Sequence, residues 1–315
     1  MRTLILFSVL IVFISCKNDK LTLSEEDQQI TIDTLQGTSL LGTPLIRPQV
    51  EAQRDSVQVA NFKTAYKAYL KDTTNIDSII WVGRRIAYLG DFQKAIQYYS
   101  KGIALHPKEA RFYRHRGHRY ISTRQFDKAI ADFNQAALLI EGTENQIEPD
   151  GVPNKFNTPI STLHGNIYYH LGLAHYLKNE LPNALLAFEK CLASGTNNDN
   201  QVSSKHWLYM IHRRLGNEKR ANELLEPITN DMEIIENVAY HQLLLFYKGE
   251  LTEEQLTGTS SSGSSEAVKY GLANWHHYNG DAEKAAFLYK LLVATGNWAG
   301  FGYIAAEADL YRMQL

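Results

Sequence analysis

Residues 81–107 read WVGRRIAYLGDFQKAIQYYSKGIALHP, and residues 113–140 read YRHRGHRYISTRQFDKAIADFNQAALLI. The second stretch repeats the order of small and large residues of the first at a spacing of 34 residues, as Gly83 and Gly117 illustrate. A fixed spacing of this length indicates stacked copies of one unit, and each copy is long enough for two helices and a turn. The two stretches therefore predict a helical-repeat fold.

Each position in the repeated unit has a physical role. Gly83 and Ala95 are small where the two helices would cross, which lets their backbones approach closely, and Tyr99 is large enough to fill the space beside the crossing. Gly90 is placed to end the first helix, because glycine adopts the left-handed conformation easily. Pro107 ends the second helix, because proline cannot continue one. The unit therefore reads as an antiparallel helix pair.

The same order recurs in four more units, which begin near residues 165, 202, 235 and 266; the unit at 235 has a shortened second helix. This period and order resemble the tetratricopeptide repeat (TPR). The resemblance implies an all-α fold for residues 50–315: a right-handed helical-repeat solenoid of about five to six TPR-like helix pairs. Residues 298–313, WAGFGYIAAEADLYRM, are predicted to form a C-terminal capping helix.

The N-terminal sequence MRTLILFSVLIVFISC has the features of a targeting segment. Its apolar run, residues 4–14, is shorter than the roughly 20 residues that a membrane-spanning helix needs. With Cys16 at its end, the segment resembles a bacterial lipoprotein signal peptide (residues 1–15), whose removal would leave a lipid on Cys16. An ordinary secretory signal that contains a cysteine is the alternative. Residues 16–49 lack helical periodicity and are predicted to be a flexible tether.

Charge and motifs favour a binding protein. The net charge of −2 argues against a nucleic-acid binder, which would carry a large positive excess. Eleven Lys and Arg stand against six Asp and Glu in residues 76–142, whereas thirteen stand against twenty in residues 143–315. The sequence has no GxGxxG after a strand, no GxxxxGK[ST], no HExxH and no GxSxG. We therefore expect no enzyme activity, no cofactor and no metal.

An arginine-rich surface is the first candidate binding site. In TPR arrays the first helix of each pair lines the concave face, and this register implies that Arg84, Arg111, Arg114 and His118 point into the groove. The forked, permanently charged guanidinium group suits carboxylates. A partner protein or peptide with acidic groups could bind there. The alternative is that these arginines form a solvated face.

An aromatic surface in the later units is the second candidate. Tyr, Trp and Arg dominate interface energies, but aromatic residues at helical spacing also form cores, so both interpretations stay open. The residues at the concave phases or next to them are Tyr169, Tyr176, His206, Trp207, Arg213, Tyr270 and His277.

Residues 141–164, EGTENQIEPDGVPNKFNTPISTLH, interrupt the period, since the second and third units begin 55 residues apart instead of 34. We call this segment the insert. A disordered linker and a structural plug are alternatives, but its spaced apolar residues favour an ordered loop. Asp150, Asn154 and Phe156 are expected at the rim of the groove, and deletion of residues 146–160 is expected to impair binding more than folding.

These features predict a protein–protein interaction scaffold of the bacterial cell envelope. A lipid would anchor it at the outer membrane, on the periplasmic face or the cell surface, and a partner would bind in the concave groove. The alternative is a small-molecule or glycan receptor that uses the aromatic and histidine side chains. It could even be a hydrolase in which Glu148 and Asp150 act as acid and base.

Overall fold

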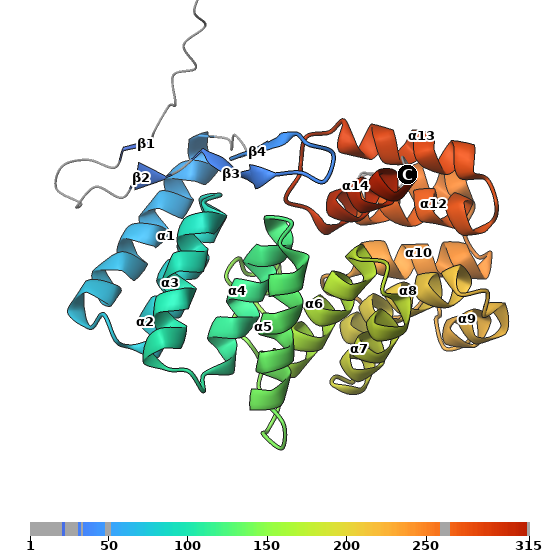
Figure 1. Ribbon diagram of the computed structural model, residues 1–315. Coiled ribbons are helices and arrows are strands. Elements are labelled where there is room, and N and C mark those ends of the chain that lie inside the picture. Colours follow the sequence, from blue (N-terminus) through green and yellow to red (C-terminus); the bar gives the residue numbers. More distant parts are fainter. Residues whose placement is uncertain (1–20, 23–30, 33, 48–51, 259–264, 314–315) are drawn as a thin grey trace, which may run out of the picture.

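The computed structural model describes residues 21–22, 31–32, 34–47, 52–258 and 265–313, so the predicted signal peptide and Cys16 lie outside the described residues. The described chain is mostly helical, and six antiparallel helix pairs lie side by side (Figure 1). The first helices of the pairs are α2 (Ile76–Tyr88), α4 (Ala110–Ser122), α6 (Leu163–Leu177), α8 (Asn198–Arg214), α10 (Val238–Lys248) and α12 (Glu266–Tyr278). The second helices are α3 (Phe92–Leu105), α5 (Phe126–Leu139), α7 (Leu181–Ala193), α9 (Glu218–Leu225), α11 (Glu253–Gly258) and α13 (Ala282–Val293).

The all-α helical-repeat solenoid predicted from the period is confirmed. The first helices begin within four residues of the predicted unit starts, and the second helix of the fifth pair, α11, is only 6 residues long. One more helix, α1 (Ala52–Lys71), precedes the first pair, and α14 (Phe301–Met313) follows the last.

The glycines of the repeat lie where the helices of a pair touch. A Cβ atom on Gly83 would lie 2.4 Å from the ring of Tyr99, and one on Gly172 would lie 2.6 Å from the ring of Phe188. Both contacts are far closer than atoms can pack, so only glycine allows the aromatic ring of the second helix to seat there. The spacing seen in the sequence thus sets the distance between the paired helices.

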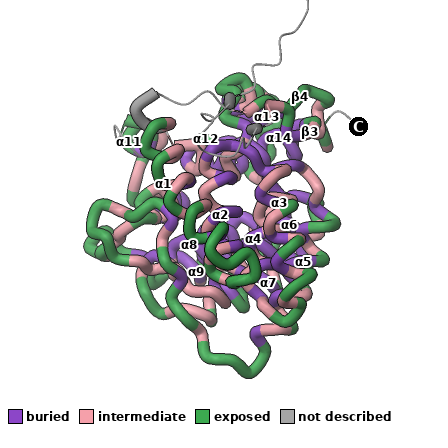
Figure 2. The backbone as a smooth tube through the Cα atoms, turned by 90° about the vertical axis from the view of Figure 1, so that its left-hand side faces the viewer, coloured by how far each residue is buried: buried purple, intermediate pink, exposed green. Residues whose placement is uncertain are grey.

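Buried segments run through the middle of the molecule, and the loops at its periphery are exposed (Figure 2). The largest core extends from α4 to α14. A second core joins α1, α2 and α3 to two residues from the other end of the chain, Trp298 and Tyr303. A third and smallest core lies between α4, α5 and α6. Figure 1 shows the C-terminal part of the chain beside the N-terminal strands. The solenoid therefore closes on itself.

Helix α14 does more than cap the last pair. It packs on α12 and α13, as predicted, and also touches α6, because Phe301 contacts His170. The buried carboxylate of Glu307 pairs with Arg124 at 2.7 Å, at the end of the turn after α4. Arg312 donates a hydrogen bond to the carbonyl of Leu177 at the end of α6. The C-terminal helix therefore covers part of the concave side.

The prediction that residues 16–49 form one flexible tether is wrong for residues 34–47. Strands β3 (Leu35–Thr38) and β4 (Pro44–Ile46) form an antiparallel hairpin against the solenoid. The buried side chain of Gln36 accepts hydrogen bonds from the backbone N–H groups of Phe92 and Gln93 at the start of α3. The indole of Trp298 donates to the carbonyl of Ile46 at 2.6 Å. Burial of a few residues by distant partners leaves no local period, which is why the hairpin was missed.

Two further strands, β1 (Leu21–Thr22) and β2 (Thr31–Ile32), pair with each other ahead of this hairpin. Within the described ranges, no helix combines the length and the hydrophobicity that a bilayer crossing would need.

Candidate binding site

Helix α2 presents an aromatic and two arginines on one face. Asn75 begins the helix by accepting a hydrogen bond from the N–H group of Ser78. Arg84 and Arg85 follow Trp81 by one helical turn and share its face. Their guanidinium groups lie 4.5 Å and 5.0 Å from the centre of the Trp81 ring. Trp81 is only partly buried. A cation held over a partly exposed indole is a surface that can bind protein.

Helix α4 contributes a second pair of arginines, which behave differently from each other. Arg111 forms ion pairs with Glu109 of its own helix start, at 2.9 Å, and with Asp77 of α2, at 2.8 Å. It therefore links two neighbouring repeats. Arg114 instead pairs with Glu148 of the insert at 3.0 Å. Of these two arginines, only Arg114 forms an ion pair with the insert.

A neutral histidine supports Arg114. Burial, together with the positive charge of Arg114, holds the pKa of His115 well below its usual range. The unprotonated Nδ1 atom can therefore accept the hydrogen bond that Arg114 donates at 2.9 Å. The ring of His115 stacks on Tyr99 with centroids 5.5 Å apart. Packing thus fixes the imidazole, and the imidazole fixes the guanidinium.

The fourth predicted concave residue, His118, lies at a contact of three helices. Its ring is 4.5 Å from that of His170 on α6 and 5.2 Å from that of Phe301 on α14. Burial and the nearby Arg119 hold its pKa well below the usual range, so it stays neutral. Helix α14 therefore packs against His118 through Phe301, and His118 remains partly exposed.

The insert is an ordered loop along the first helices. It closes on itself through a bridge between Ile147 and Thr162, and the hydroxyl of Thr162 begins α6 by accepting from the N–H group of Gly165. Arg84 donates to the carbonyl of Pro149 at 2.9 Å, and Arg85 donates to that of Gly151 at 2.8 Å.

The buried side chain of Glu148 accepts from the amide of Asn166 on α6, in addition to its ion pair with Arg114. A carboxylate with these partners is poorly placed to act as a catalytic acid or base. The insert thus contacts α2, α4 and α6 through one carboxylate and two carbonyl groups.

The three predicted rim residues lie further along the insert. Asn154 donates to the carboxylate of Glu236, just ahead of α10, at 2.7 Å. Burial raises the pKa of Asp150 and, with Asp150 nearby, that of Glu236. Phe156 is 57% exposed, and its ring lies 4.8 Å from the ammonium group of Lys155. The insert therefore spans from the first pair to the fifth.

Three hollows adjoin the insert. One of about 350 Å³ is lined by residues 148–152 of the insert and by Arg84, Tyr88, Arg114 and Glu236. A second, of about 280 Å³, is lined by Trp81, Arg84, Arg111 and Ile147. A third, also of about 280 Å³, is lined by Asn166, Tyr169, Asn200, Ser203, Tyr240 and Phe301. The insert therefore fills the groove only in part.

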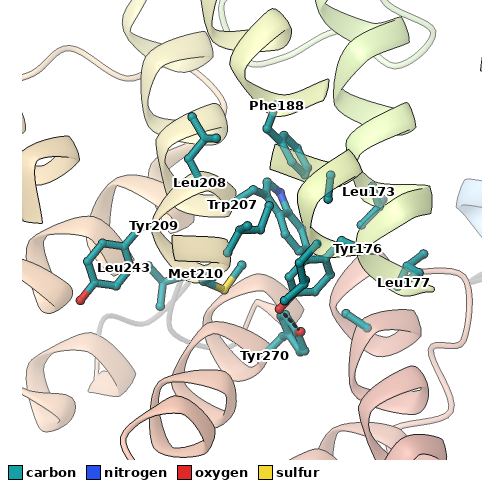
Figure 3. Close-up of a cluster of buried hydrophobic side chains, with 14 of the residues drawn as sticks. Leu173, Tyr176, Leu177, Phe188, Trp207, Leu208, Tyr209, Met210, Leu243 and Tyr270 are labelled. Atoms are coloured by element: carbon teal, nitrogen blue, oxygen red, sulfur yellow. Dashed lines mark hydrogen bonds between the residues drawn. The ribbon is translucent and has the colours of Figure 1, made fainter. Parts of the chain in front are cut away.

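Of the two interpretations of the aromatic surface in the later units, the structure shows a core for four of its seven members. Tyr176, His206, Trp207 and Tyr270 are at most 2% exposed. Figure 3 shows Trp207 between Phe188 and Tyr176, and the hydroxyl groups of Tyr176 and Tyr270 bound to each other at 2.7 Å.

The reason is the C-terminal fold-back. Tyr270 donates to the buried Asp309 of α14 at 2.9 Å. Although burial alone would raise it, Arg214 and Arg312 hold the pKa of Asp309 well below its usual range. Helix α14 and Arg214 of α8 thus cover Tyr176 and Tyr270 with a charged network, whereas His206 stacks on Tyr240 of α10.

The remaining members of that set are partly exposed. Tyr169 lines the third hollow, and its hydroxyl binds the indole of Trp207 at 2.8 Å. Arg213 donates to Asn279 at 2.7 Å and lies 4.8 Å from the ring of Tyr278. Burial lowers the pKa of His277. Arg213 and His277 line none of the three hollows described above.

Sequence reasoning missed several residues of the site, above all Trp81, Arg85, Asn166 and Glu236. Trp81 could have been predicted, because it precedes Arg84 by three residues and Arg85 by four and so shares their helix face. Asn166 and Glu236 could not have been predicted, because only the path of the insert brings them to the site. In the described part of the chain, no group of three or more His, Cys, Asp and Glu side chains is placed to hold a metal ion.

No protein-family model matches the sequence, and no curated protein matches it. Among solved structures, a tetratricopeptide repeat protein from Parabacteroides merdae is similar, with 18% identity over 82% of this chain and 93% of that chain and a TM-score of 0.49. YrrB, a TPR protein with an unusual peptide-binding site, is similar over 81% of this chain and 100% of its own, with 15% identity and a TM-score of 0.42. MamA covers 65% of this chain with all of its own length, at 14% identity and a TM-score of 0.43. These are distant likenesses of fold.

Proposed function

We propose that the chain is a protein-binding scaffold of the bacterial cell envelope, held at a membrane by a lipid on Cys16. Its partner binds along α2 and α4, on the concave face. The observation that supports this most is Trp81, a partly exposed indole stacked with Arg84 and Arg85. It lines the second hollow described above and a further one of about 300 Å³ between α1 and α2. Trp and Arg in such settings supply most of the free energy in protein interfaces.

Site-specific photo-cross-linking tests the binding face. A photoreactive amino acid replaces Trp81 in one strain and Asn134, an exposed residue of the outer helix α5, in a matched control strain. We expect an adduct of higher mass from position 81 and none from position 134. Adducts from position 134 alone, or from neither position, would contradict binding on the concave face.

The membrane anchor has its own test. Cys16→Ser removes the only sulfur that the lipid could use, so the full-length protein is expected to move from the membrane fraction to the soluble fraction. Unchanged membrane fractionation of Cys16→Ser would show that lipid on Cys16 is not the anchor.

A small neutral ligand is the second candidate, favoured by the third hollow. Its rings and amides, from Tyr169, Tyr240 and Asn166, are the groups that bind a sugar ring. However, the hydroxyl groups of Tyr169 and Tyr240 already bind each other at 2.8 Å. Calorimetric titration with envelope sugars, repeated with Ser203→Leu to fill the hollow, tests this candidate. Heat that persists in Ser203→Leu would exclude the hollow as its site.

A further inference from the structure

The contacts of the insert resemble those of a bound peptide. Glu148 supplies one buried carboxylate, which Arg114 holds at 3.0 Å and which Asn166 also binds. The carbonyls of Pro149 and Gly151 then accept hydrogen bonds from Arg84 and Arg85. The receiving side chains come from α2, α4 and α6, three successive repeats. An extended segment from any chain could offer the same three groups.

The burial pattern of the insert separates a bound segment from a structural plug. A plug would bury its apolar side chains against the helices, since that burial is what stabilises a core. Ile147, Val152 and Phe156 are instead 62%, 58% and 57% exposed. The polar contacts therefore hold the insert, and another chain can replace polar contacts one for one.

Two buried polar atoms in or beside the insert have no hydrogen-bond partner in the described part of the chain. The Nε atom of Arg114 is buried and has no hydrogen-bond partner among the described residues, and the same holds for one carboxylate oxygen of Asp150. Both residues line the 350 Å³ hollow. A ligand that placed two oxygens on Arg114 would satisfy its fork better than Glu148 does.

We propose that the insert is a built-in competitor of the partner, and that the partner is an acidic, extended segment of another protein. Its carboxylate displaces Glu148 from Arg114 and Asn166, and its backbone carbonyls replace those of the insert on Arg84 and Arg85. This proposal rests on the proposed function, namely that a protein partner binds the concave face. A segment tethered in the same chain has an effective concentration in the millimolar range. The insert therefore lowers the apparent affinity of the groove for any other segment that binds the same arginines.

The insert itself provides the probe. A fluorescent peptide of residues 144–162 is titrated into the intact chain and into a variant in which residues 146–160 are a Gly/Ser linker of equal length. We expect the peptide to bind the linker variant at least ten times more tightly than the intact chain. Equal binding to both, or no binding to a folded linker variant, would overturn the proposal.

Matched changes locate the contact. Glu148→Gln in the peptide, or Arg114→Gln in the linker variant, is expected to weaken binding at least ten-fold. Glu144→Gln removes the same charge from an exposed residue of the same peptide and should leave affinity unchanged. If Glu148→Gln and Glu144→Gln peptides bind equally, the buried carboxylate is not the recognised group and the proposal fails.

A second measurement serves if the linker variant does not fold. In the full chain, Glu148→Gln should raise hydrogen exchange in residues 146–160 and leave α2 and α4 protected. Faster exchange throughout α2 and α4 would show that the insert is a structural plug and would overturn the proposal.

The peptide and cross-linking experiments distinguish the two proposals. Peptide binding without a cross-linked partner at position 81 would contradict the scaffold function alone, whereas a cross-linked partner without peptide binding would contradict the competitor role of the insert alone.

Discussion

At the scale of single residues, a left-handed backbone position recurs in the turn inside each helix pair. Arg124 occupies this position after α4 with a φ of 62°, where a residue other than glycine costs roughly 1 to 2 kcal/mol. Its guanidinium explains why arginine is there, because it pairs with the fully buried Glu307 and donates to the carbonyl of Trp298. The other turns have Gly90, Asn179, Gly216, Gly249 and Gly280 at the same position.

Arg124→Gly relieves backbone strain but breaks a buried ion pair. The relief of strain should stabilise the fold by about 1 kcal/mol, whereas leaving Glu307 buried without its partner should destabilise it by about 3 to 5 kcal/mol. We expect a net loss of about 2 to 4 kcal/mol in the free energy of unfolding, measured by urea denaturation with circular dichroism. Adding Glu307→Gln should recover part of the loss, because it removes the unpaired charge.

Asn179→Gly is the matched control, since Asn179 is exposed and has the same backbone conformation, with a φ of 61°. It should leave stability unchanged or raise it slightly. If Arg124→Gly behaves like Asn179→Gly, the ion pair with Glu307 contributes nothing to stability and this account of Arg124 is wrong.

Buried histidines make stability depend on pH. Burial lowers the pKa of His170 and of His206 to about 3. Below pH 6.5 the unfolded chain binds protons at these histidines while the folded chain does not. Stability is therefore complete above pH 6.5 and falls as the pH decreases toward 3, by about 1.4 kcal/mol per pH unit for each histidine.

His206→Phe tests this dependence. The ring of His206 stacks on Tyr240 at 4.7 Å, and its Nδ1 atom has no hydrogen-bond partner in the described ranges, so phenylalanine keeps the packing. Between pH 6 and pH 4, the slope of the unfolding free energy against pH should decrease by about 1.4 kcal/mol per unit. Identical slopes for the variant and the parent would show that His206 takes up its proton in the folded state.

At the scale of helices, the sequence predicted those elements whose cause is local. The contact of Gly83 with Tyr99 and the left-handed turn at Gly90 follow from residues within one unit, so the period showed them. The burial of Tyr270 depended on Asp309 of α14, and that of Trp207 on Tyr176 and Tyr270, all of which lie outside the unit of the residue that they cover. A helical period shows which residues share a face and cannot show whether another helix covers that face.

Asp199 lies in the polar run NNDN at residues 197–200, a composition typical of a solvated turn. The run instead begins α8, and Asp199 is 3% exposed. Its carboxylate accepts hydrogen bonds from the backbone N–H groups of Ile235, Glu236 and Asn237. This one side chain therefore fixes the start of α10 on the start of α8.

Asp199→Ala leaves three backbone N–H groups without their acceptor. We expect a loss of about 2 to 4 kcal/mol, since hydrogen bonds to a charged group contribute about 1.5 to 3 kcal/mol each and water can replace some of them. Urea denaturation gives the value, and Asp231→Ala, an exposed carboxylate of the preceding loop, is the control. Equal stability of the two variants would show that water replaces Asp199 fully.

At the scale of the whole molecule, two segments far apart in the sequence close the solenoid. The backbone N–H of Leu40 in the hairpin donates to Glu307, and Trp298 meets Phe92 edge-on with ring centroids 5.4 Å apart. Such closure was beyond sequence reasoning, because contacts across more than 200 residues leave no period.

Truncation tests whether the hairpin holds the closure together. A chain of residues 48–315 loses Gln36 from the start of α3, the buried side chain of Leu45, and the carbonyl of Ile46 that binds Trp298. Burial of one leucine contributes about 1.5 to 3 kcal/mol and each hydrogen bond about 1 kcal/mol, so Tm should decrease by roughly 5 to 10 °C. Trp298 should also become accessible to fluorescence quenchers.

A chain of residues 34–315 is the control. It keeps the hairpin and should unfold at the temperature of the chain that begins at residue 17. If residues 48–315 unfold at that same temperature, the hairpin contributes no stability to the solenoid, and α14 alone holds the closure together.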